Sequence, residues 1–243
     1  MKGGTIICKP ITLEQIKHCY TPYNLEEVNC MLNQQLMGFD KKIVVIDDDP
    51  TGIQTVHDVS VYTDWSTSSI KKGFQEKANM FFILTNSRSF SAEKTEKVHR
   101  DIGERLAAVS KETGKQFIVI SRGDSTLRGH YPLETESIRL AIEKESKIYF
   151  DGEIIVPFFE EGGRFTIEDI HYILQNGTLI PVGETEFAED KTFGYKNSNL
   201  AQWIEEKSHG AYLASEVVKV SLKSLRNRNY EDSETIEYDK KLR

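Results

Sequence analysis

The sequence has little cysteine and no long apolar run, and both scarcities limit what the protein can be. Its three cysteines, Cys8, Cys19 and Cys30, form an odd set near the N-terminus, without a histidine at zinc-ligand spacing. We therefore expect reduced thiols in a cytoplasmic protein. The apolar run at the N-terminus is too short for a signal peptide, and no later run reaches the length of a membrane span.

Positive charge is also scarce. The chain has 31 Lys and Arg against 38 Asp and Glu, which gives a net charge of −7. Nucleic-acid binding depends on neutralising phosphates, so this balance and the absence of a basic patch argue against a DNA or RNA partner. With 243 residues, 38% of them hydrophobic, the chain is long enough to bury a substantial core. Composition thus predicts a globular protein with no nucleic-acid and no membrane partner.

Apolar runs that end in polar loops alternate with amphipathic segments along the middle of the chain. The run from Ile43 to Ile46 is followed at once by three aspartates and then by Pro50 and Gly52. Strands of parallel sheets are continuous apolar runs, and helices connect them. We therefore expect an α/β fold, a doubly wound, mostly parallel sheet with helices on both faces and right-handed crossovers. The expected strands are residues 43–46, 59–63, 80–84, 116–120, 153–156 and 217–220.

The regions outside this alternation have different patterns of apolar and polar residues. Residues 1–40 carry two short amphipathic segments, which predicts an N-terminal helical extension. The pair Asn176-Gly177 between apolar residues is typical of a two-residue hairpin, so a small antiparallel excursion is expected after residue 164. The polar stretch 227–243 is typical of a tail or a shortened linker. The α/β domain itself is expected over residues 41–226.

Three of the expected strands end in polar loops of complementary charge. These loops are Asp47 to Thr51, Thr85 to Arg88 and Arg122 to Arg128. Ligands of open α/β sheets bind beyond the carboxyl ends of the strands, so we expect the loops to form one site. Arginine can hold a carboxylate through paired hydrogen bonds and aspartate accepts from hydroxyls, which together suit a small polyhydroxy acid. Alternatively, the arginines only neutralise the aspartates in a structural ion-pair network.

The first loop also fits a different chemistry. The run Asp47 to Thr51 after an apolar strand matches the Asp-x-Asp-x-Thr pattern of haloacid-dehalogenase-type phosphatases, with Asp47 as nucleophile, Asp49 as acid/base and Thr85 as the second-motif hydroxyl. Such an enzyme also needs a lysine and an acidic pair that holds magnesium, for which the sequence offers only Asp151. The pattern gives the arginine-rich third loop no role, so the phosphatase is kept as the alternative.

Four segments together resemble the sugar-binding N-terminal domain of the four-carbon acid sugar kinases, relatives of threonate and erythronate kinases. They are Asp-Asp-Pro-Thr-Gly at 48–52, Thr-Asn-Ser-Arg at 85–88, Ser-Arg-Gly-Asp-Ser-Thr-Leu-Arg-Gly at 121–129 and Glu-Thr-Glu-Phe-Ala-Glu-Asp at 184–190. The third is the most specific. The resemblance covers roughly residues 43–225, and it departs from many relatives at Arg122, where they carry lysine.

The resemblance implies a substrate, a reaction and site residues. The implied substrate contacts are Asp48, Asp49, Arg88, Arg122, Gly123, Asp124 and Ser125. The implied reaction is ATP-dependent phosphorylation of a hydroxyl on a short sugar acid such as threonate or erythronate, with ATP and Mg²⁺ as cofactors held mostly by a C-terminal domain. A carboxylate must accept the hydroxyl proton, and of Asp49 and Asp124 we favour Asp124, because neighbouring arginines would keep it ionised.

Members of that family have a second, C-terminal domain with a glycine-rich nucleotide site, and this sequence reaches Arg243 without one. We therefore expect a kinase lobe that binds the sugar acid but is inactive alone. It would be an expressed fragment, a split gene product whose partner is a separate nucleotide-binding half, or a non-catalytic sugar-acid-binding protein. A homo-oligomer is a further expectation.

Overall fold

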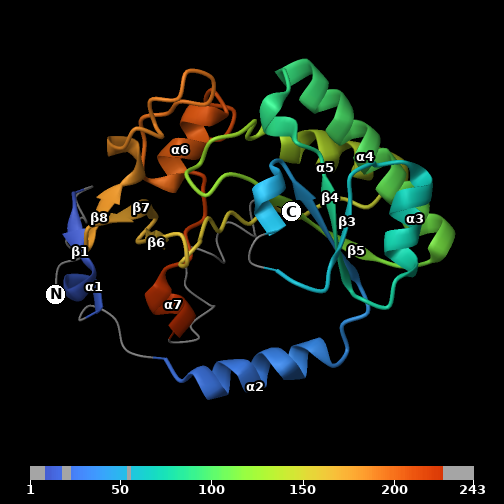
Figure 1. Cartoon of the computed structure of the whole chain (residues 1–243), viewed down its shortest axis with the longest axis horizontal. Helices are drawn as coiled ribbons and strands as arrows, with labels where there is room; N and C mark the ends of the chain where they lie inside the picture. The colour runs from blue at the N-terminus through green and yellow to red at the C-terminus, as the bar shows by residue number, and fades with distance from the viewer. Residues whose placement is uncertain (1–8, 18–22, 54–55, 227–243) are drawn as a thin grey trace. The chain divides into compact units, whose positions relative to one another are not determined.

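A computed structural model describes residues 9–17, 23–53 and 56–226 of the chain (Figure 1). Its contacts divide the chain into two compact units. The described residues between 33 and 155 form the parallel-sheet unit, and the described residues before 33 and after 155 form the antiparallel-sheet unit. The α/β class, with a parallel sheet, helices and a smaller antiparallel sheet, is confirmed.

The parallel sheet places the ends of its strands in register. Its order is β3 (Ser60–Tyr62), β4 (Met80–Leu84), β2 (Lys42–Asp47) and β5 (Phe117–Arg122). Asp47 at the end of β2 pairs with Leu84 on one side and Arg122 on the other. The polar loops after these three strands therefore begin side by side, at the C-terminal ends of the strands. We call this end of the sheet the carboxyl edge.

Three helices belong to this unit. They are α3 (Thr67–Gln75), α4 (Ala92–Thr113) and α5 (Leu133–Ser146). Ser66 and Ser91 cap α3 and α4, each accepting a hydrogen bond from the backbone N–H three residues on. Gly114 ends α4 with a φ of 67°, as a C-cap glycine does.

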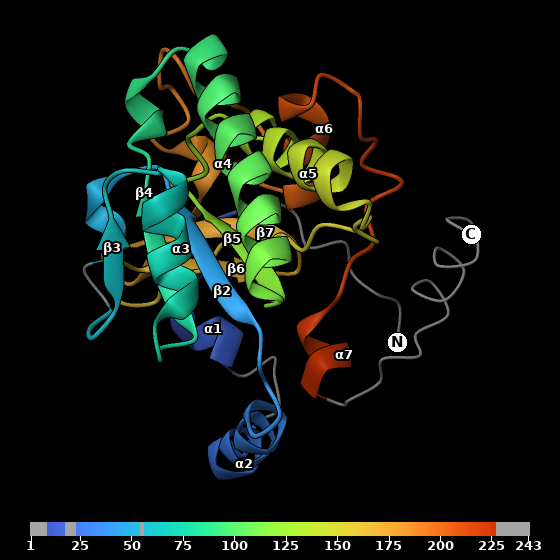
Figure 2. The same cartoon turned by 90° about the vertical axis from the view of Figure 1, so that its right-hand side faces the viewer.

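One face of the parallel sheet carries the core of the unit. Val44 and Ile46 of β2 lie beside Phe81 and Ile83 of β4, and because side chains alternate along a strand, all four point to the same face. They pack against buried residues of all three helices, namely Ile70, Phe74, Val98, Ile102, Leu106, Val109, Ile138 and Ile142. The three helices thus lie on one face of the sheet (Figure 2).

This placement corrects the expectation of helices on both faces. The crossover from β3 to β4 through α3 and the crossover from β4 to β5 through α4 run in the same direction along the sheet. Two right-handed crossovers that run in the same direction place their helices on the same side. The sequence predicts the alternation of strand and helix but not the strand order that decides the face.

Two predicted strands are absent from the described structure, and the prediction was wrong for both. Residues 153–156 and 217–220 have no strand pairing, and the side chains of Ile154 and Val156 are 90% and 75% exposed. β-branched residues favour a strand only where a neighbouring strand and a buried face are available. The apolar composition of these segments is therefore not enough to make them strands.

The antiparallel-sheet unit has its own small core. Its sheet runs in the order β1 (Ile11–Thr12), β8 (Thr178–Pro181), β7 (Ile170–Gln175) and β6 (Arg164–Ile167). Asn176 and Gly177 join β7 to β8 with φ angles of 50° and 80°, so the predicted hairpin is confirmed. Ile170, Tyr172 and Leu179 form the buried centre.

Four further helices complete the description. They are α1 (Leu13–Lys17), α2 (Leu25–Leu36), α6 (Leu200–Lys207) and α7 (Leu222–Arg226). The two helices expected within residues 1–40 are thus present in the described part, and none of the residues of α2 is buried. Among the described helices, none has both the length and the apolar character that a bilayer span requires. The predicted tail, 227–243, lies outside the described residues.

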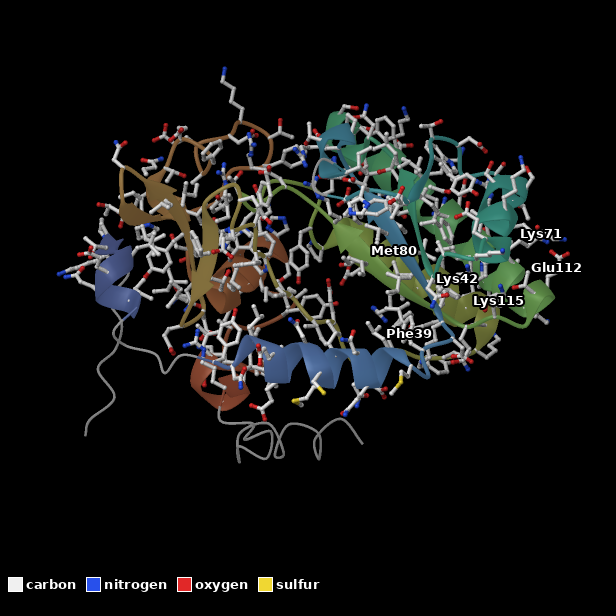
Figure 3. All side chains as sticks on the ribbon, turned by 60° about the horizontal axis from the view of Figure 1, so that its bottom comes forward. Phe39, Lys42, Lys71, Met80, Glu112 and Lys115 are labelled. Carbon is white, nitrogen blue, oxygen red and sulfur yellow. The ribbon has the colours of Figure 1, made fainter. Side chains whose placement is uncertain are left out.

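The amino-terminal edge of the parallel sheet holds the end of α3 through lysines (Figure 3). Lys42 is only 2% exposed, and its Nζ donates to the carbonyls of Glu76 and Ala78 at 2.7 and 2.5 Å. Lys115 Nζ donates to the carbonyl of Phe74 at 2.8 Å. The last carbonyls of a helix have no partner within it, so these ammonium groups satisfy them. Burial, aided by the charge of Lys115, lowers the pKa of Lys42.

Candidate functional site

The carboxyl edge brings the first, second and third polar loops together around one guanidinium group. Arg88 donates from Nε to Asp48 Oδ2 at 2.9 Å and from Nη2 to Asp48 Oδ1 at 2.7 Å, a two-pronged pair. Its Nη1 lies 3.3 Å from Asp49 Oδ2 and 3.7 Å from Asp124 Oδ1. The three loops therefore converge, and Asp48, Asp49, Arg88 and Asp124 are neighbours.

The backbone fixes this convergence. The ladder of the sheet continues past the strand ends, because Thr85 N donates to Asp47 O at 2.9 Å and Asp48 N donates to Arg122 O at 3.3 Å. Arg88 N then donates to Asp48 O at 3.3 Å. The short helical turn η2 (Ser87–Ser89) follows Asn86, which has a left-handed φ of 57°. These bonds hold the arginine of the second loop over the aspartates of the first.

Asp47 and Arg122 form a separate pair across neighbouring strands. Arg122 Nη1 lies 3.3 Å from Asp47 Oδ1, and the N–H of Asp49 donates to the same oxygen at 3.3 Å. The side chain of Asp47 is fully buried, and its Oδ2 has no hydrogen-bond partner among the described residues. Burial raises the pKa of Asp47, and the charge of Arg122 opposes that rise.

Gly52 covers the unpartnered oxygen of Asp47. The residue belongs to the turn η1 (Pro50–Ile53), and a β-carbon built on it would overlap Asp47 Oδ2 and come within 2.5 Å of Asp47 Cγ. Only glycine allows the backbone of this turn to approach the carboxylate so closely. The glycine of the predicted Asp-Asp-Pro-Thr-Gly segment thus has a defined packing role.

Asp124 is held ionised by donors from its own loop. Arg128 Nε donates to Asp124 Oδ2 at 2.8 Å, and the hydroxyl of Thr126 donates to the same oxygen. Burial raises the pKa of Asp124, but the hydrogen bonds from Arg128 and Thr126 and the charges of Arg128 and Arg88 outweigh it, so the pKa is lowered. Asp124 Oδ1 contacts only Arg88, at 3.7 Å, among the interactions of the described residues.

Asp49 is ionised for a different reason and is more accessible. The hydroxyl and the N–H of Thr51 donate to Asp49 Oδ1 at 2.5 and 2.8 Å. The hydroxyl bond is the largest influence and lowers the pKa of Asp49, with burial opposing and the charges of Arg88 and Arg122 assisting. The side chain is 25% exposed, so a ligand can reach it. Asp48, at 3%, is out of reach, and burial raises its pKa against the opposing bond from Arg88.

The two predicted carboxylate-binding arginines differ in how much of their hydrogen-bonding capacity is used. Arg88 is engaged by three carboxylates. Arg122 makes a single side-chain hydrogen bond within the described part of the chain, and its side chain is 30% exposed. Gly123 beside it is exposed and has open space where a β-carbon would lie, and Ser125 in the same loop is half-buried. Arg122 is therefore the guanidinium that remains open to an anion.

A buried polar layer below this edge was missed by the sequence reasoning. Ser87 Oγ donates to Glu134 Oε1 at 2.6 Å, and Thr85 Oγ1 lies 3.0 Å from Ser87 Oγ. His99 Nε2 lies 3.8 Å from the same Glu134 oxygen. Burial raises the pKa of Glu134 and lowers the pKa of His99. The sequence did contain a signal for Glu134. This acid lies four residues before Ile138 and so falls on the apolar face of α5.

The geometry argues against the phosphatase alternative. A nucleophilic aspartate must be reached by the phosphorus of its substrate, whereas Asp47 is fully buried, paired with Arg122 and covered by Gly52. The described residues also contain no group of three or more His, Cys, Asp or Glu side chains placed to hold a metal ion. The aspartates of this edge are directed at arginines instead. They do not fit a Mg²⁺ site.

The chain is similar to known proteins over most of its length. A family model described as "Sugar-binding N-terminal domain" matches residues 43–239. A crystal structure from Bordetella bronchiseptica, described as a domain of unknown function (DUF1537) with bound citrate in a domain-swapped dimer, has 24% sequence identity and a TM-score of 0.51. That match covers 68% of this chain and 41% of the other, so this chain spans well under half the length of that relative.

A second crystal form of the Bordetella protein has 24% identity and a TM-score of 0.48, with 67% of this chain and 39% of that chain covered. No curated protein matches. At this level of identity the structural likeness shows the fold, and the family model is what identifies the relationship.

Proposed function

The chain belongs to the family of sugar-binding N-terminal domains, in agreement with its resemblance to four-carbon acid sugar kinases, and from this we propose that it binds a short sugar acid for ATP-dependent phosphorylation. The substrate would be a four-carbon acid such as threonate or erythronate. In this proposal the chain is the substrate-binding lobe of a kinase.

The observation that carries the proposal is the open guanidinium of Arg122 at the same edge as two ionised carboxylates, Asp49, whose side chain is 25% exposed, and Asp124, whose side chain is 11% exposed. A sugar acid has one carboxylate and several hydroxyls. Arg122 can hold the carboxylate through paired hydrogen bonds, while Asp49 and Asp124 accept from the hydroxyls. Arg88, already occupied, would keep the aspartates in place. The spare, partly exposed donors of Arg122 favour this division of roles over a network that is only structural.

Asp124 is the carboxylate that we propose as the proton acceptor. Phosphoryl transfer requires mainly positioning and charge neutralisation, with a base that accepts the proton of the attacking hydroxyl. The lowered pKa of Asp124 keeps it ionised at neutral pH, and its Oδ1 is the less occupied oxygen. Asp49 is the second candidate, because it is ionised and more exposed.

ATP and Mg²⁺ are assigned in this proposal to a separate nucleotide-binding domain. The described residues offer no acidic cluster suited to a cation, and the sequence contains no glycine-rich phosphate loop of the Walker type. A kinase assay would therefore add a C-terminal nucleotide-binding domain of a relative to this chain. Turnover that requires both parts supports the lobe, whereas tight binding without turnover in any combination favours a non-catalytic sugar-acid-binding protein.

Binding is tested by isothermal titration calorimetry with erythronate and threonate, and with erythritol as the analogue that lacks the carboxylate. We expect the acids to bind and erythritol not to bind, because only the acids engage Arg122. The variant Arg122→Ala should lose binding, whereas Arg100→Ala, which removes an exposed arginine of α4, should keep it. Equal binding of erythritol, or no binding of either acid, would contradict the proposal.

We also propose that the chain self-associates. Leu25, Val28 and Leu32 of α2 lie on one side of that helix at helical spacing and are each more than 40% exposed. Light scattering on the purified chain tests this, and a monomer at high concentration would overturn it. The citrate and the domain-swapped dimer of the Bordetella structure are properties of that protein and make citrate a useful third probe here.

A further inference from the structure

We infer that Asp47 is a proton-binding residue of this site, which takes up one proton from solvent when the carboxylate of a sugar acid binds to Arg122. The inference rests on the proposed function. The proposed function names the groups that contact the ligand. The inference adds how the site accommodates the negative charge that the ligand brings.

The first step is a charge count over the carboxyl-edge network, defined as Asp47, Asp48, Asp49, Asp124, Arg88, Arg122 and Arg128. It contains four carboxylates and three guanidinium groups: the pair of Asp47 and Arg122, and the ion pairs among Arg88, Arg128 and the other three aspartates. When all are ionised, the network already carries one uncompensated negative charge. A bound sugar acid adds a second, and because the carboxylate of Asp47 is buried, a further negative charge beside it favours its protonation.

The second step identifies which carboxylate protonates. Asp48 is held by both prongs of Arg88, Asp49 by two donors of Thr51, and Asp124 by Arg128 and Thr126. Asp47 alone among the four has a buried oxygen without a hydrogen-bond partner in the described structure, and its other oxygen has only two contacts, both at 3.3 Å. Within the described residues, Asp124 Oδ1 also accepts no hydrogen bond, but it lies 3.7 Å from the guanidinium of Arg88. The charged form of Asp47 is the least stabilised of the four.

The third step considers the charges that face Asp47 among the described residues. Arg122 faces it from β5, and Asp48 and Asp49 adjoin it in the loop. The neighbours from β4 and η1, Leu84 and Gly52, bring no charge. Arg122 is thus the only cation in this set, and a ligand carboxylate that shares it weakens the attraction that keeps Asp47 ionised.

The balance of the step is simple. The sugar acid binds as an anion, a solvent proton forms an O–H bond at Asp47, and the carboxylate becomes a neutral carboxyl group. No bond of the ligand changes. The network with ligand and proton then has the same net charge as the empty network, which is the physical reason for the coupling.

The experiment measures proton uptake directly. Erythronate and threonate are titrated into the full chain by calorimetry at neutral pH in phosphate and in Tris, whose ionisation enthalpies differ. We expect the apparent binding enthalpy to differ between the buffers by the amount that corresponds to uptake of about one proton. We also expect the affinity to fall about tenfold per pH unit between the pKa of Asp47 in the free chain and its higher pKa in the complex, and to level off above the latter. Identical enthalpies in the two buffers would overturn the inference.

Variants assign the proton to Asp47. Asp47→Asn should bind without buffer dependence, because the amide is already neutral. Asp58→Asn is the matched control, since Asp58 is 93% exposed, and it should keep the uptake of the unmodified chain. Uptake that persists in Asp47→Asn would place the proton elsewhere and contradict the inference.

A spectroscopic readout covers the case in which Asp47→Asn does not fold. Infrared difference spectra of the unmodified chain, recorded with and without erythronate, should show the carbonyl band of a new protonated carboxyl group. The absence of that band on saturation overturns the inference. If neither acid binds at all, the proposed function fails and the inference falls with it, whereas binding without uptake removes the inference alone.

Discussion

The two edges of the parallel sheet both bury charge, but only one leaves a charged group partly unused. At the amino edge, Lys42 and Lys115 donate to carbonyls at the end of α3 and in the turn that follows it. At the carboxyl edge, opposite charges meet, Arg122 has spare donors, and Asp47 keeps an oxygen without a partner. Burial of charge alone therefore does not mark a binding site, and incomplete pairing is the better indicator.

The largest expected effect that tests this comparison is on ligand affinity. Arg122→Ala removes the open guanidinium, and we expect the affinity for erythronate or threonate to fall by about 3 kcal/mol, or roughly 100-fold. Lys115→Ala removes a cation from the amino edge and should change the affinity less than twofold. Calorimetric titration of both variants checks this, and a similar loss in both would remove the distinction between the edges.

The second effect is on stability, and it is expected at the amino edge rather than at the carboxyl edge. Lys42→Met keeps the length of the side chain but leaves the carbonyls of Glu76 and Ala78 without their donor, so we expect a loss of about 2 kcal/mol in the free energy of unfolding. Urea denaturation measures it, with Lys41→Met as the adjacent control. Ligand affinity of the folded Lys42→Met variant should be unchanged, and a large drop in affinity would contradict the assignment of this edge to stability.

A smaller effect separates a ligand-binding aspartate from a structural one. Asp49→Asn keeps an acceptor for Thr51 but weakens the acceptance of ligand hydroxyls, so we expect about a tenfold loss of affinity, equivalent to about 1.4 kcal/mol. Asp64→Asn is the matched control, because Asp64 also accepts from the N–H two residues on, that of Ser66, in the same unit. Equal affinities of the two variants would show that Asp49 does not contact the ligand.

The smallest expected effect is a difference in the pH dependence of stability. The pKa of Asp124 is lowered in the folded chain, so its contribution is fully present above the unfolded value of about 4 and is lost as the pH falls through the lower, folded pKa. Asp124→Asn should therefore lose less stability than the unmodified chain between about pH 4 and pH 2. Urea denaturation across this range measures the two slopes, and identical slopes would contradict the lowered pKa.

The sequence predicted the convergence of the polar loops better than it predicted the sheet, for a physical reason. Each polar loop directly follows an apolar run, and parallel register brings loops at strand ends together, so Asp49, Arg88 and Asp124 could be placed near one another from sequence alone. Residues 153–156 have strand composition too, but pairing depends on a neighbour that composition does not reveal.

The buried residues of the site differ in how far the sequence could have predicted them. Side chains alternate along β2, so Asp47 shares a face with Val45 and not with Asp48, and this pattern was available. Glu134 and His99 come from α5 and α4, and their approach to Ser87 depends on how two helices pack on one face of the sheet. That packing follows from strand order, which local sequence does not encode.

The seclusion of Lys42 has a practical consequence for following this protein in solution. An amine that is 2% exposed and bonded to two carbonyls cannot be acylated while the sheet is intact. Lys72 and Lys77, both exposed, react without any opening. The ratio of label at position 42 to label at positions 72 and 77, read by mass spectrometry, therefore reports how often this end of the sheet opens.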